Sequence, residues 1–185
     1  MAFDNIPVIG TGNMLMRDEG GGVRAVEEVD ARYRLRNTVR VIDDGTTGKE
    51  LFEPMRHADC LIFADAVNVD SPPGTLVRIA NEEIRAFFQT KLSNHQLGLS
   101  DLLALLAFKG ETPRDVAIVG MLPHVLENKL SLSAPAAAGL DEMVQMLLAK
   151  LAKVGAGATA SDEVRSGHWR LQAELEREEG LAVCA

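Results

Sequence analysis

Residues 6–42 read IPVIGTGNMLMRDEGGGVRAVEEVDARYRLRNTVRVI, and this stretch decides the fold. It opens with a short apolar run that ends at Gly10. Apolar residues then recur three and four apart among charges over residues 23–35, and a second apolar run occupies residues 38–42. A short apolar run bounded by glycine is typical of a buried strand, and the three-four spacing is typical of an amphipathic helix. The stretch therefore predicts a strand, a helix and a second strand.

The same order of elements repeats further along the chain. Leu51, Phe52 and Met55 recur at helical spacing before a third apolar run, CLIFADAV, that begins at Cys60. A fourth run, TLVRIA, follows the helix-breaking turn NVDSPPGT, and a fifth, DVAIVGM, begins at Asp115. This alternation predicts an α/β protein with a twisted, mostly parallel five-stranded sheet and helices on both faces, a three-layer sandwich. The fourth strand is expected at an edge.

Two further helices and a boundary are predicted in the second half. Residues 96–108 are strongly apolar at helical spacing, and a long closing helix begins after Ser133 as its cap and ends near Val154. The small, polar sequence GAGATASDE that follows is typical of a linker. We therefore predict a domain over residues 1–154 and, over residues 155–185, a linker with a weakly ordered, partly helical C-terminal appendage.

Composition excludes several classes of protein. The 185 residues are 46% hydrophobic, enough for one substantial core and too few for two ordinary domains. The 19 basic and 27 acidic residues give a formal net charge of -8, which disfavours binding to nucleic acid or to an anionic membrane surface. The N-terminal sequence MAFDNIPVIG signals neither secretion nor membrane insertion. With 2 cysteines and no Cys-x-x-Cys pair, a reducing compartment fits best, and we expect a cytoplasmic protein.

Acidic residues and one histidine follow the predicted strands. In a sheet of this kind ligands bind beyond the carboxyl ends of the strands, so the residues just after each strand are informative. Those positions hold Asp18, Glu19, Asp43, Asp44, Asp65 and His95. Carboxylate and imidazole groups are ligands that nickel, zinc and iron accept. The pattern alone leaves two interpretations open, a metal site or solvated acids beside a loop histidine.

Other enzyme classes fit the sequence poorly. Gly10 and Gly12 match the start of a dinucleotide-binding motif, but Leu15 stands where the third glycine belongs, and two acids follow where phosphate would approach. No GxSxG motif of a serine hydrolase follows any strand. Cys60 opens an apolar strand, and no histidine motif is placed to activate it as a nucleophile.

Four loop sequences resemble those of the hydrogenase maturation proteases. They are GTGNMLMRDEGGGVRAVE from Gly10, DDGTTGKEL from Asp43, FADAVNVDSPPGTL from Phe63 and SNHQLGLSDLLALL from Ser93. Their order and spacing are typical of that family, and the resemblance spans residues 7–151. It implies a twisted sheet with helices on both faces, which agrees with the fold predicted from the apolar pattern.

The resemblance also implies a metal-directed site. In this family a glutamate of the DEG motif, an aspartate of the DA motif and a histidine of the HQLG motif bind a metal, and the matching residues here are Glu19, Asp65 and His95. Asp43 lies in a motif that reads DDGT where the family more commonly has DGGT. The family's grouping with aspartic-type peptidases makes Asp43 and Asp65 the candidate catalytic residues.

The function that the resemblance implies is proteolytic processing. The family removes the C-terminal extension of a nickel-iron hydrogenase large-subunit precursor after nickel has been inserted. Nickel would then arrive with the substrate as a recognition element, and no permanently bound metal is expected. Whether a carboxylate is the general base or the metal polarises the scissile carbonyl stays open. The alternative is a non-catalytic metal-binding or assembly module that escorts a hydrogenase subunit. For the appendage two interpretations are open, binding of an assembly chaperone or no function, and its composition favours the second.

Overall fold

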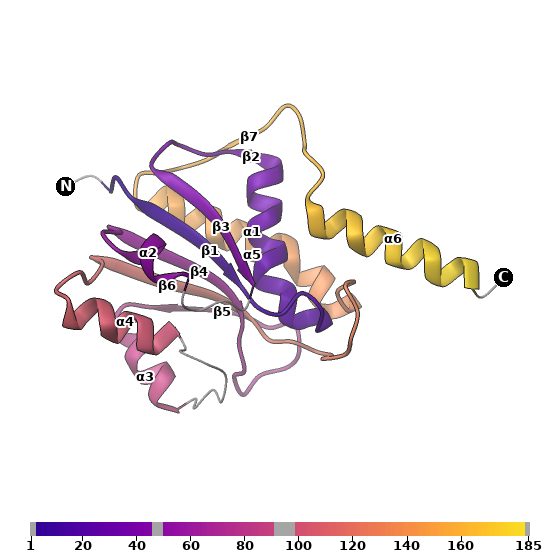
Figure 1. Cartoon of the computed structure of the whole chain (residues 1–185), viewed down its shortest axis with the longest axis horizontal. Coiled ribbons are helices and arrows are strands. Elements are labelled where there is room, and N and C mark those ends of the chain that lie inside the picture. Colours follow the sequence, from indigo (N-terminus) through magenta and orange to yellow (C-terminus); the bar gives the residue numbers. More distant parts are fainter. Residues whose placement is uncertain (1–2, 46–49, 91–98, 184–185) are drawn as a thin grey trace.

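The centre of the protein is a twisted five-stranded sheet (Figure 1). The structure is a computed structural model that describes residues 3–45, 50–90 and 99–183. The strands, in the order β3-β1-β4-β6-β5 across the sheet, are β1 (Ile6–Thr11), β3 (Val39–Gly45), β4 (Cys60–Ala66), β5 (Leu76–Ala80) and β6 (Asp115–Met121). Within it β5 runs antiparallel to β6, and the other described pairs are parallel. The predicted mostly parallel sheet, with its fourth strand at an edge, is confirmed.

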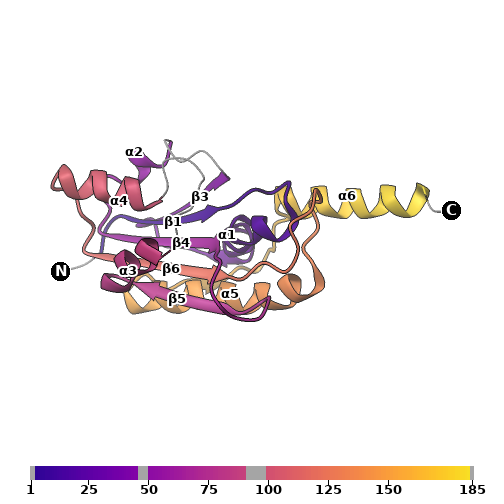
Figure 2. The ribbon, with the colours of Figure 1, turned by 90° about the horizontal axis from the view of Figure 1, so that it is seen from below.

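Helices cover both faces of the sheet. Figure 2 shows α2 and α4 on one side of the strands and α5 on the other. The bounds are α1 (Gly21–Arg32), α2 (Phe52–Met55), α3 (Glu82–Thr90), α4 (Leu99–Phe108) and α5 (Ala134–Lys153), with a short 3-10 helix η1 (Arg17–Gly20) before α1. The sequence analysis did not predict α3. The helix that it predicted over residues 96–108 corresponds to α4, and the first residues of that prediction lie outside the described residues.

Alternate residues of each strand enter two separate cores. Val8 and Ile62 pack in a cluster with residues of α1 and α5, whereas Ile9 and Phe63 pack in a second cluster with residues of α2, α3 and α4. All four side chains are fully buried. Successive strand residues point to opposite faces, so a strand buried on both faces needs an unbroken apolar run, as this sequence has. Polar side chains that could bind a ligand are therefore expected at the ends of the strands.

The C-terminal segment leaves the sheet and returns along α1. Ser133 caps α5, accepting a hydrogen bond from the amide of Ala136 at 3.4 Å. After α5, β7 (Thr159–Ala160) pairs antiparallel with β2 (Tyr33–Arg34), and α6 (His168–Val183) projects from the body (Figure 1). The appendage is helical over α6, whereas its separation from a domain ending at residue 154 stays a prediction. No helix among the described residues is long and apolar enough to cross a membrane.

Candidate functional site

The carboxyl ends of β1, β3 and β4 meet at one edge of the sheet. The parallel register aligns Gly10 of β1 with Asp43 on one neighbour and with Ala64 on the other. Asp65 follows Ala64 directly, and the loop that carries Glu19 leaves from the end of β1. Three of the motifs singled out in the sequence therefore open on the same edge, where ligands of such sheets bind.

The loop after β1 folds back onto the end of its own strand. Gly12 has φ +130, and a Cβ there would lie 1.9 Å from the carbonyl oxygen of Glu19. Its amide also donates a 2.9 Å hydrogen bond to the carbonyl of Gly45 at the end of β3. The side chain of Asn13 accepts from the amide of Leu15 at 3.0 Å and closes a tight turn. Only glycine permits this path, which brings Glu19 back toward the sheet.

The glycine run before α1 serves packing between helix and strand. A Cβ on Gly22 would lie 2.1 Å from the carbonyl oxygen of Ala64 and 2.6 Å from that of Thr11. Backbone atoms of β1 and β4 therefore occupy the space beside the start of α1. This close approach accounts for glycine at residue 22 without a phosphate ligand.

Asp65 has a carboxyl group with a raised pKa. Burial at the end of β4 is the largest cause, and it raises the pKa of Asp65 to about 6, with the negative charge of Glu19 acting in the same direction. Hydrogen bonds from the Thr11 hydroxyl and from the Ala66 amide, the latter at 2.9 Å, oppose the shift. Glu19 and Asp65 are thus near enough to repel one another. A carboxylate pair of this kind is suited to holding a cation or to exchanging a proton near neutral pH.

Asp18, next to Glu19 in sequence, has a structural role. Its side chain is 1% exposed and accepts hydrogen bonds from the amides of His124, Val125 and Ser133 and from the Ser133 hydroxyl, at 2.6 to 3.0 Å. Burial opposes its ionisation, but the bonds from Ser133, Val125 and His124 outweigh burial and lower the pKa of Asp18. Asp18 therefore ties η1 to the loop before α5.

Asp43 is held by a residue that the sequence analysis did not assign to the site. The Asp43 side chain lies exposed at the end of β3, and its Oδ2 accepts a 2.7 Å hydrogen bond from Nε1 of Trp169. Trp169 belongs to the first turn of α6, 126 positions away along the chain. The one available signal was a lone tryptophan in an otherwise polar segment, since large aromatic residues are seldom left unpacked.

The third predicted metal ligand, His95, lies outside the described residues. Within residues 3–45, 50–90 and 99–183, no three histidine, cysteine, aspartate or glutamate side chains are grouped so that they could hold a metal ion. The structure brings Glu19 and Asp65 together and places Asp43 on the same edge of the sheet. The three-ligand site itself stays a prediction.

Comparisons with known proteins identify the family. The family model for hydrogenase maturation proteases matches residues 23–150, more than half of the chain. The chain belongs to the hydrogenase maturation protease family. The Hydrogenase 2 maturation protease of Escherichia coli K12 is 40% identical to it over 160 residues, which cover 86% of this chain and 98% of that protein. Family and fold therefore agree with the predictions made from the loop motifs.

Two further similarities support the assignment. The hydrogenase expression/formation protein HoxM of Azotobacter vinelandii is 42% identical over 164 residues, covering 88% of this chain and 79% of that protein. The solved structure of the hydrogenase maturating endopeptidase HybD from E. coli superposes with a TM-score of 0.80 at 41% identity, covering 84% of this chain and 97% of that one. The present protease is thus a maturation endopeptidase with the HybD-type α/β fold.

The cysteine of β4 does not act as the nucleophile of this protease. Cys60 is buried, and burial raises the pKa of its thiol to about 12, with Asp115 and Asp59 adding to the shift. A thiol of that pKa is almost wholly protonated at neutral pH and is a poor nucleophile. Cys60 is a core residue, as its place at the start of an apolar strand predicted.

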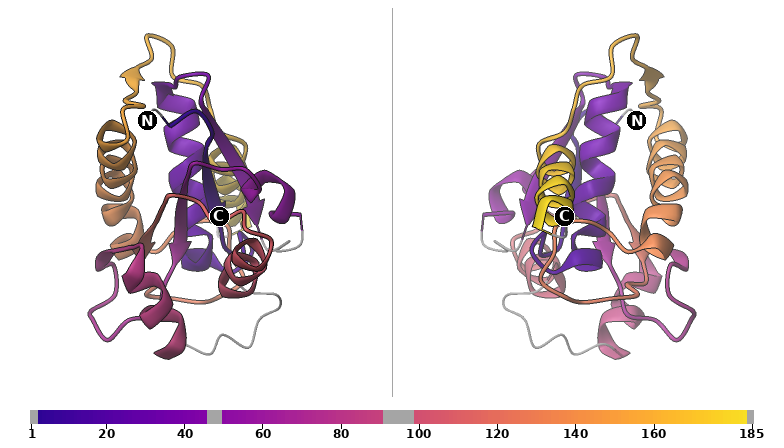
Figure 3. Two further views of the ribbon diagram at one scale, coloured as in Figure 1. Left: turned by 90° about the vertical axis from the view of Figure 1, so that its left-hand side faces the viewer. Right: turned by 90° about the vertical axis from the view of Figure 1, so that its right-hand side faces the viewer.

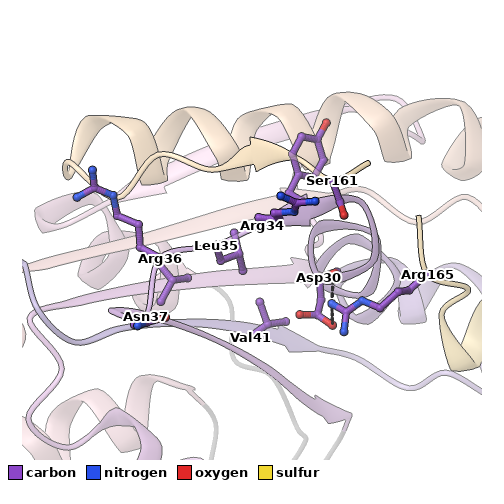
Figure 4. A pocket seen from close by; sticks show the side chains of 10 residues that line it. Asp30, Arg34, Leu35, Arg36, Asn37, Val41, Ser161 and Arg165 are labelled. Carbon is purple, nitrogen blue, oxygen red and sulfur yellow. Dashed lines mark hydrogen bonds and ion pairs between the residues drawn. The ribbon is translucent and has the colours of Figure 1, made fainter. Parts of the chain in front are cut away.

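The protease also has a pocket of about 490 Å³ away from the site (Figure 4). Val39 and Val41, near the start of β3, contribute to its lining, whereas Asp43 lies toward the end of that strand. One wall is closed by the ion pair between Arg165 and Asp30, at 3.0 Å. None of the predicted site residues lines this pocket, so we do not assign the cleavage chemistry to it.

Proposed function

We propose that this protease removes the C-terminal extension of a nickel-iron hydrogenase large-subunit precursor, and that it recognises the nickel already inserted in that precursor. The names of its relatives, a Hydrogenase 2 maturation protease and a hydrogenase expression/formation protein, support a hydrogenase subunit as the substrate. The observation that carries the proposal is the pair of carboxylates formed by Asp65 at the end of β4 and Glu19 in η1, whose charge adds to the raised pKa of Asp65. On the charge and cysteine content of the chain, we place the activity in the cytoplasm.

The pair is suited to a cation that arrives from outside. Burial and the charge of Glu19 make the ionised form of Asp65 costly in the free protein. A divalent metal beside the two carboxylates would reverse the sign of the local field and favour both ionised forms. Nickel accepts carboxylate and imidazole ligands, and by the family resemblance we propose His95 as the third. Precursors with nickel would then be held more tightly than precursors without it.

Cleavage requires a water molecule to attack the scissile carbonyl while the peptide is held in register. We propose that the bound nickel centre fixes that register, because positioning alone accounts for a large share of many rate enhancements. Asp43 and Asp65 are the candidate groups to take the proton from water, as in an aspartic-type peptidase. Polarisation of the carbonyl by the substrate's nickel is the alternative route to the same products.

The test is processing of purified precursor by purified protease, with and without nickel in the precursor. We expect the wild type to cut only the nickel-loaded form, and Glu19→Gln, Asp65→Asn and His95→Ala each to lower processing at least about 100-fold, since losing one ligand removes a bond to the metal. The matched control is Glu82→Gln, a change of the same kind on the exposed first turn of α3.

Two results would contradict the proposal. Efficient cleavage of the nickel-free precursor by the wild type would show that nickel is not the recognition element. Full activity of folded Glu19→Gln and His95→Ala variants would remove these residues from the site. Tight binding of the loaded precursor without any cleavage would instead favour the escort module.

A further inference from the structure

We propose that Trp169 is a positioning residue for Asp43, so that the first turn of the C-terminal helix α6 completes the cleavage site. The inference rests on the proposed function, in which Asp43 is a candidate catalytic residue. The family match ends at residue 150, so α6 lies beyond the matched part of the chain. The proposal assigns a role in the reaction to a segment that the family resemblance does not cover.

The indole fixes one oxygen of the Asp43 carboxylate. Nε1 of Trp169 donates to Oδ2 of Asp43 at 2.7 Å, and Oδ1 accepts no hydrogen bond from the described residues. An aspartate on an exposed strand end has free rotation about its side-chain bonds unless a partner holds it. A group that accepts a proton from an attacking water must keep its orientation, and a fixed neighbouring donor supplies that. Trp169 therefore acts through Asp43, without contact to the substrate.

The backbone of Trp169 is itself held by side chains of α1. Its amide donates to Oε1 of Glu27 at 2.6 Å, the amide of Arg170 donates to Oε2 at 3.1 Å, and its carbonyl accepts from Nη1 of Arg24 at 2.9 Å. Arg24 is only 8% exposed, and because arginine is almost never buried without a specific partner, its bond to the Trp169 carbonyl helps to explain its burial. The Glu27 carboxylate also satisfies two of the free amides that begin α6. The contact between α6 and α1 thus consists of two charged side chains of α1, one bound to the amide and one to the carbonyl of Trp169.

Further contacts fix the direction of α6. A Cβ on Gly167 would lie 2.2 Å from Cδ of Glu27, so any larger residue there would displace the Glu27 side chain from its bonds to the start of α6. Two turns further on, Glu176 accepts hydrogen bonds from the amides of Leu130 and Ser131 at 3.1 to 3.3 Å. Figure 3, which looks nearly along the axis of α6, shows the helix beside α1, and Figure 1 shows that beyond this contact α6 projects from the body. Held at two places, the helix keeps the indole directed at the end of β3.

The experiment compares Trp169→Phe with the wild type on the nickel-loaded precursor. Phenylalanine keeps the aromatic packing and removes the N–H donor. We expect kcat to fall about five- to tenfold, the loss typical of one net hydrogen bond at an exposed position, with KM within about twofold and an unchanged thermal midpoint. Leu171→Ala on the same helix, 44% exposed in the wild type, is the matched control and should leave kcat unchanged.

An unchanged kcat in Trp169→Phe, or an equal loss in Leu171→Ala, overturns the proposal while leaving the proposed function intact. If the wild type does not cleave the precursor, the proposed function fails instead, and fluorescence still tests the contact. Trp169 is the sole tryptophan, so its emission reports on Asp43 directly. Asp43→Ala should shift that emission and Asp44→Ala should not. Equal emission spectra for Asp43→Ala and the wild type would overturn the contact. This test does not depend on Trp169→Phe and holds even if that variant fails to fold.

Discussion

Replacing Asp18 by asparagine tests whether two adjacent acids have opposite roles. Asp18 is fully enclosed and accepts four hydrogen bonds, whereas the neighbouring Glu19 is half-buried and its carboxylate accepts none from the described residues. We expect Asp18→Asn to destabilise the protein strongly and Glu19→Gln to leave its stability within about 0.5 kcal/mol of the wild type, as is usual for substitutions outside such networks.

The magnitude follows from the geometry of the four bonds. With the asparagine oxygen at the position of Oδ2, the bonds from His124, Val125 and the Ser133 hydroxyl keep an acceptor but lose its charge. The new NH₂ group then meets the Ser133 amide, which donates to Oδ1 at 2.7 Å in the wild type. An unsatisfied buried donor costs about 1–3 kcal/mol, and bonds to charged acceptors are worth about 1 kcal/mol more than neutral ones. Together these losses exceed about 3 kcal/mol, but asparagine avoids the cost of burying a charge, which offsets part of them, so the expected loss is about 3 kcal/mol.

The assay is urea unfolding followed by circular dichroism, with equal m-values required for comparison. The hydrogen bonds lower the folded pKa of Asp18, so the stability it contributes is complete above its unfolded pKa, near 3.8, and disappears as the pH falls through the folded value. The difference in free energy of unfolding between the wild type and Asp18→Asn should therefore become smaller below about pH 4. Wild-type stability in Asp18→Asn at pH 7, or a larger loss in Glu19→Gln, would refute the division of roles.

Two further predictions concern the same edge of the sheet. Asp65 has a folded pKa of about 6, above its unfolded value near 3.8. The stability that its protonated carboxyl contributes is therefore complete below pH 3.8 and is lost as the pH rises through 6. The free energy of unfolding of Asp65→Asn should therefore rise by up to about 3 kcal/mol relative to that of the wild type between pH 4 and pH 7.5. The same difference between the two proteins at both pH values would contradict this. Gly22→Ala should cost at least about 2 kcal/mol because its methyl group would lie 2.1 Å from the Ala64 carbonyl oxygen. In Gly139→Ala in α5 the methyl group would lie 3.2 Å from Sδ of Met121 and 3.4 Å from the carbonyl oxygen of Gly74, contacts that a small shift accommodates, so stability should change by less than about 1 kcal/mol. Equal thermal midpoints for the two alanine variants would refute the close approach.

The parts of the fold that sequence predicts are those with a strong local pattern. The buried strands were found because parallel strands covered on both faces need unbroken apolar runs, and CLIFADAV from Cys60 is one. Ser133 was found as a cap because serine before an apolar helix has a local physical reason to be there. α3 was missed because it follows β5 after a single residue, Asn81, with no glycine or proline between them to mark its start.

The candidate site could be predicted only in part, because the roles of its acids depend on long-range contacts. Loop motifs singled out Glu19 and Asp65, but nothing local separates Glu19 from Asp18. The difference arises from amides of the loop before α5, more than 100 positions away. The bond from Trp169 to Asp43 is also long-range, and the polar linker-like sequence between residue 155 and α6 pointed away from any such contact.

The structure also explains why Glu19 stays beside Asp65 although the two carboxylates repel each other. The four bonds to Asp18 fix η1, and the close passage of Gly12 fixes the loop before it, so Glu19 cannot withdraw without breaking contacts elsewhere. Local strain persists only where the surrounding structure overdetermines it. On the proposed function, a precursor that brings nickel relieves the repulsion and a nickel-free precursor does not. Because burial is the largest cause of the raised pKa of Asp65, relief of the repulsion from Glu19 accounts for only part of the shift, and the preference for the loaded precursor from this source is smaller than the roughly hundredfold that the whole shift of about two units would give.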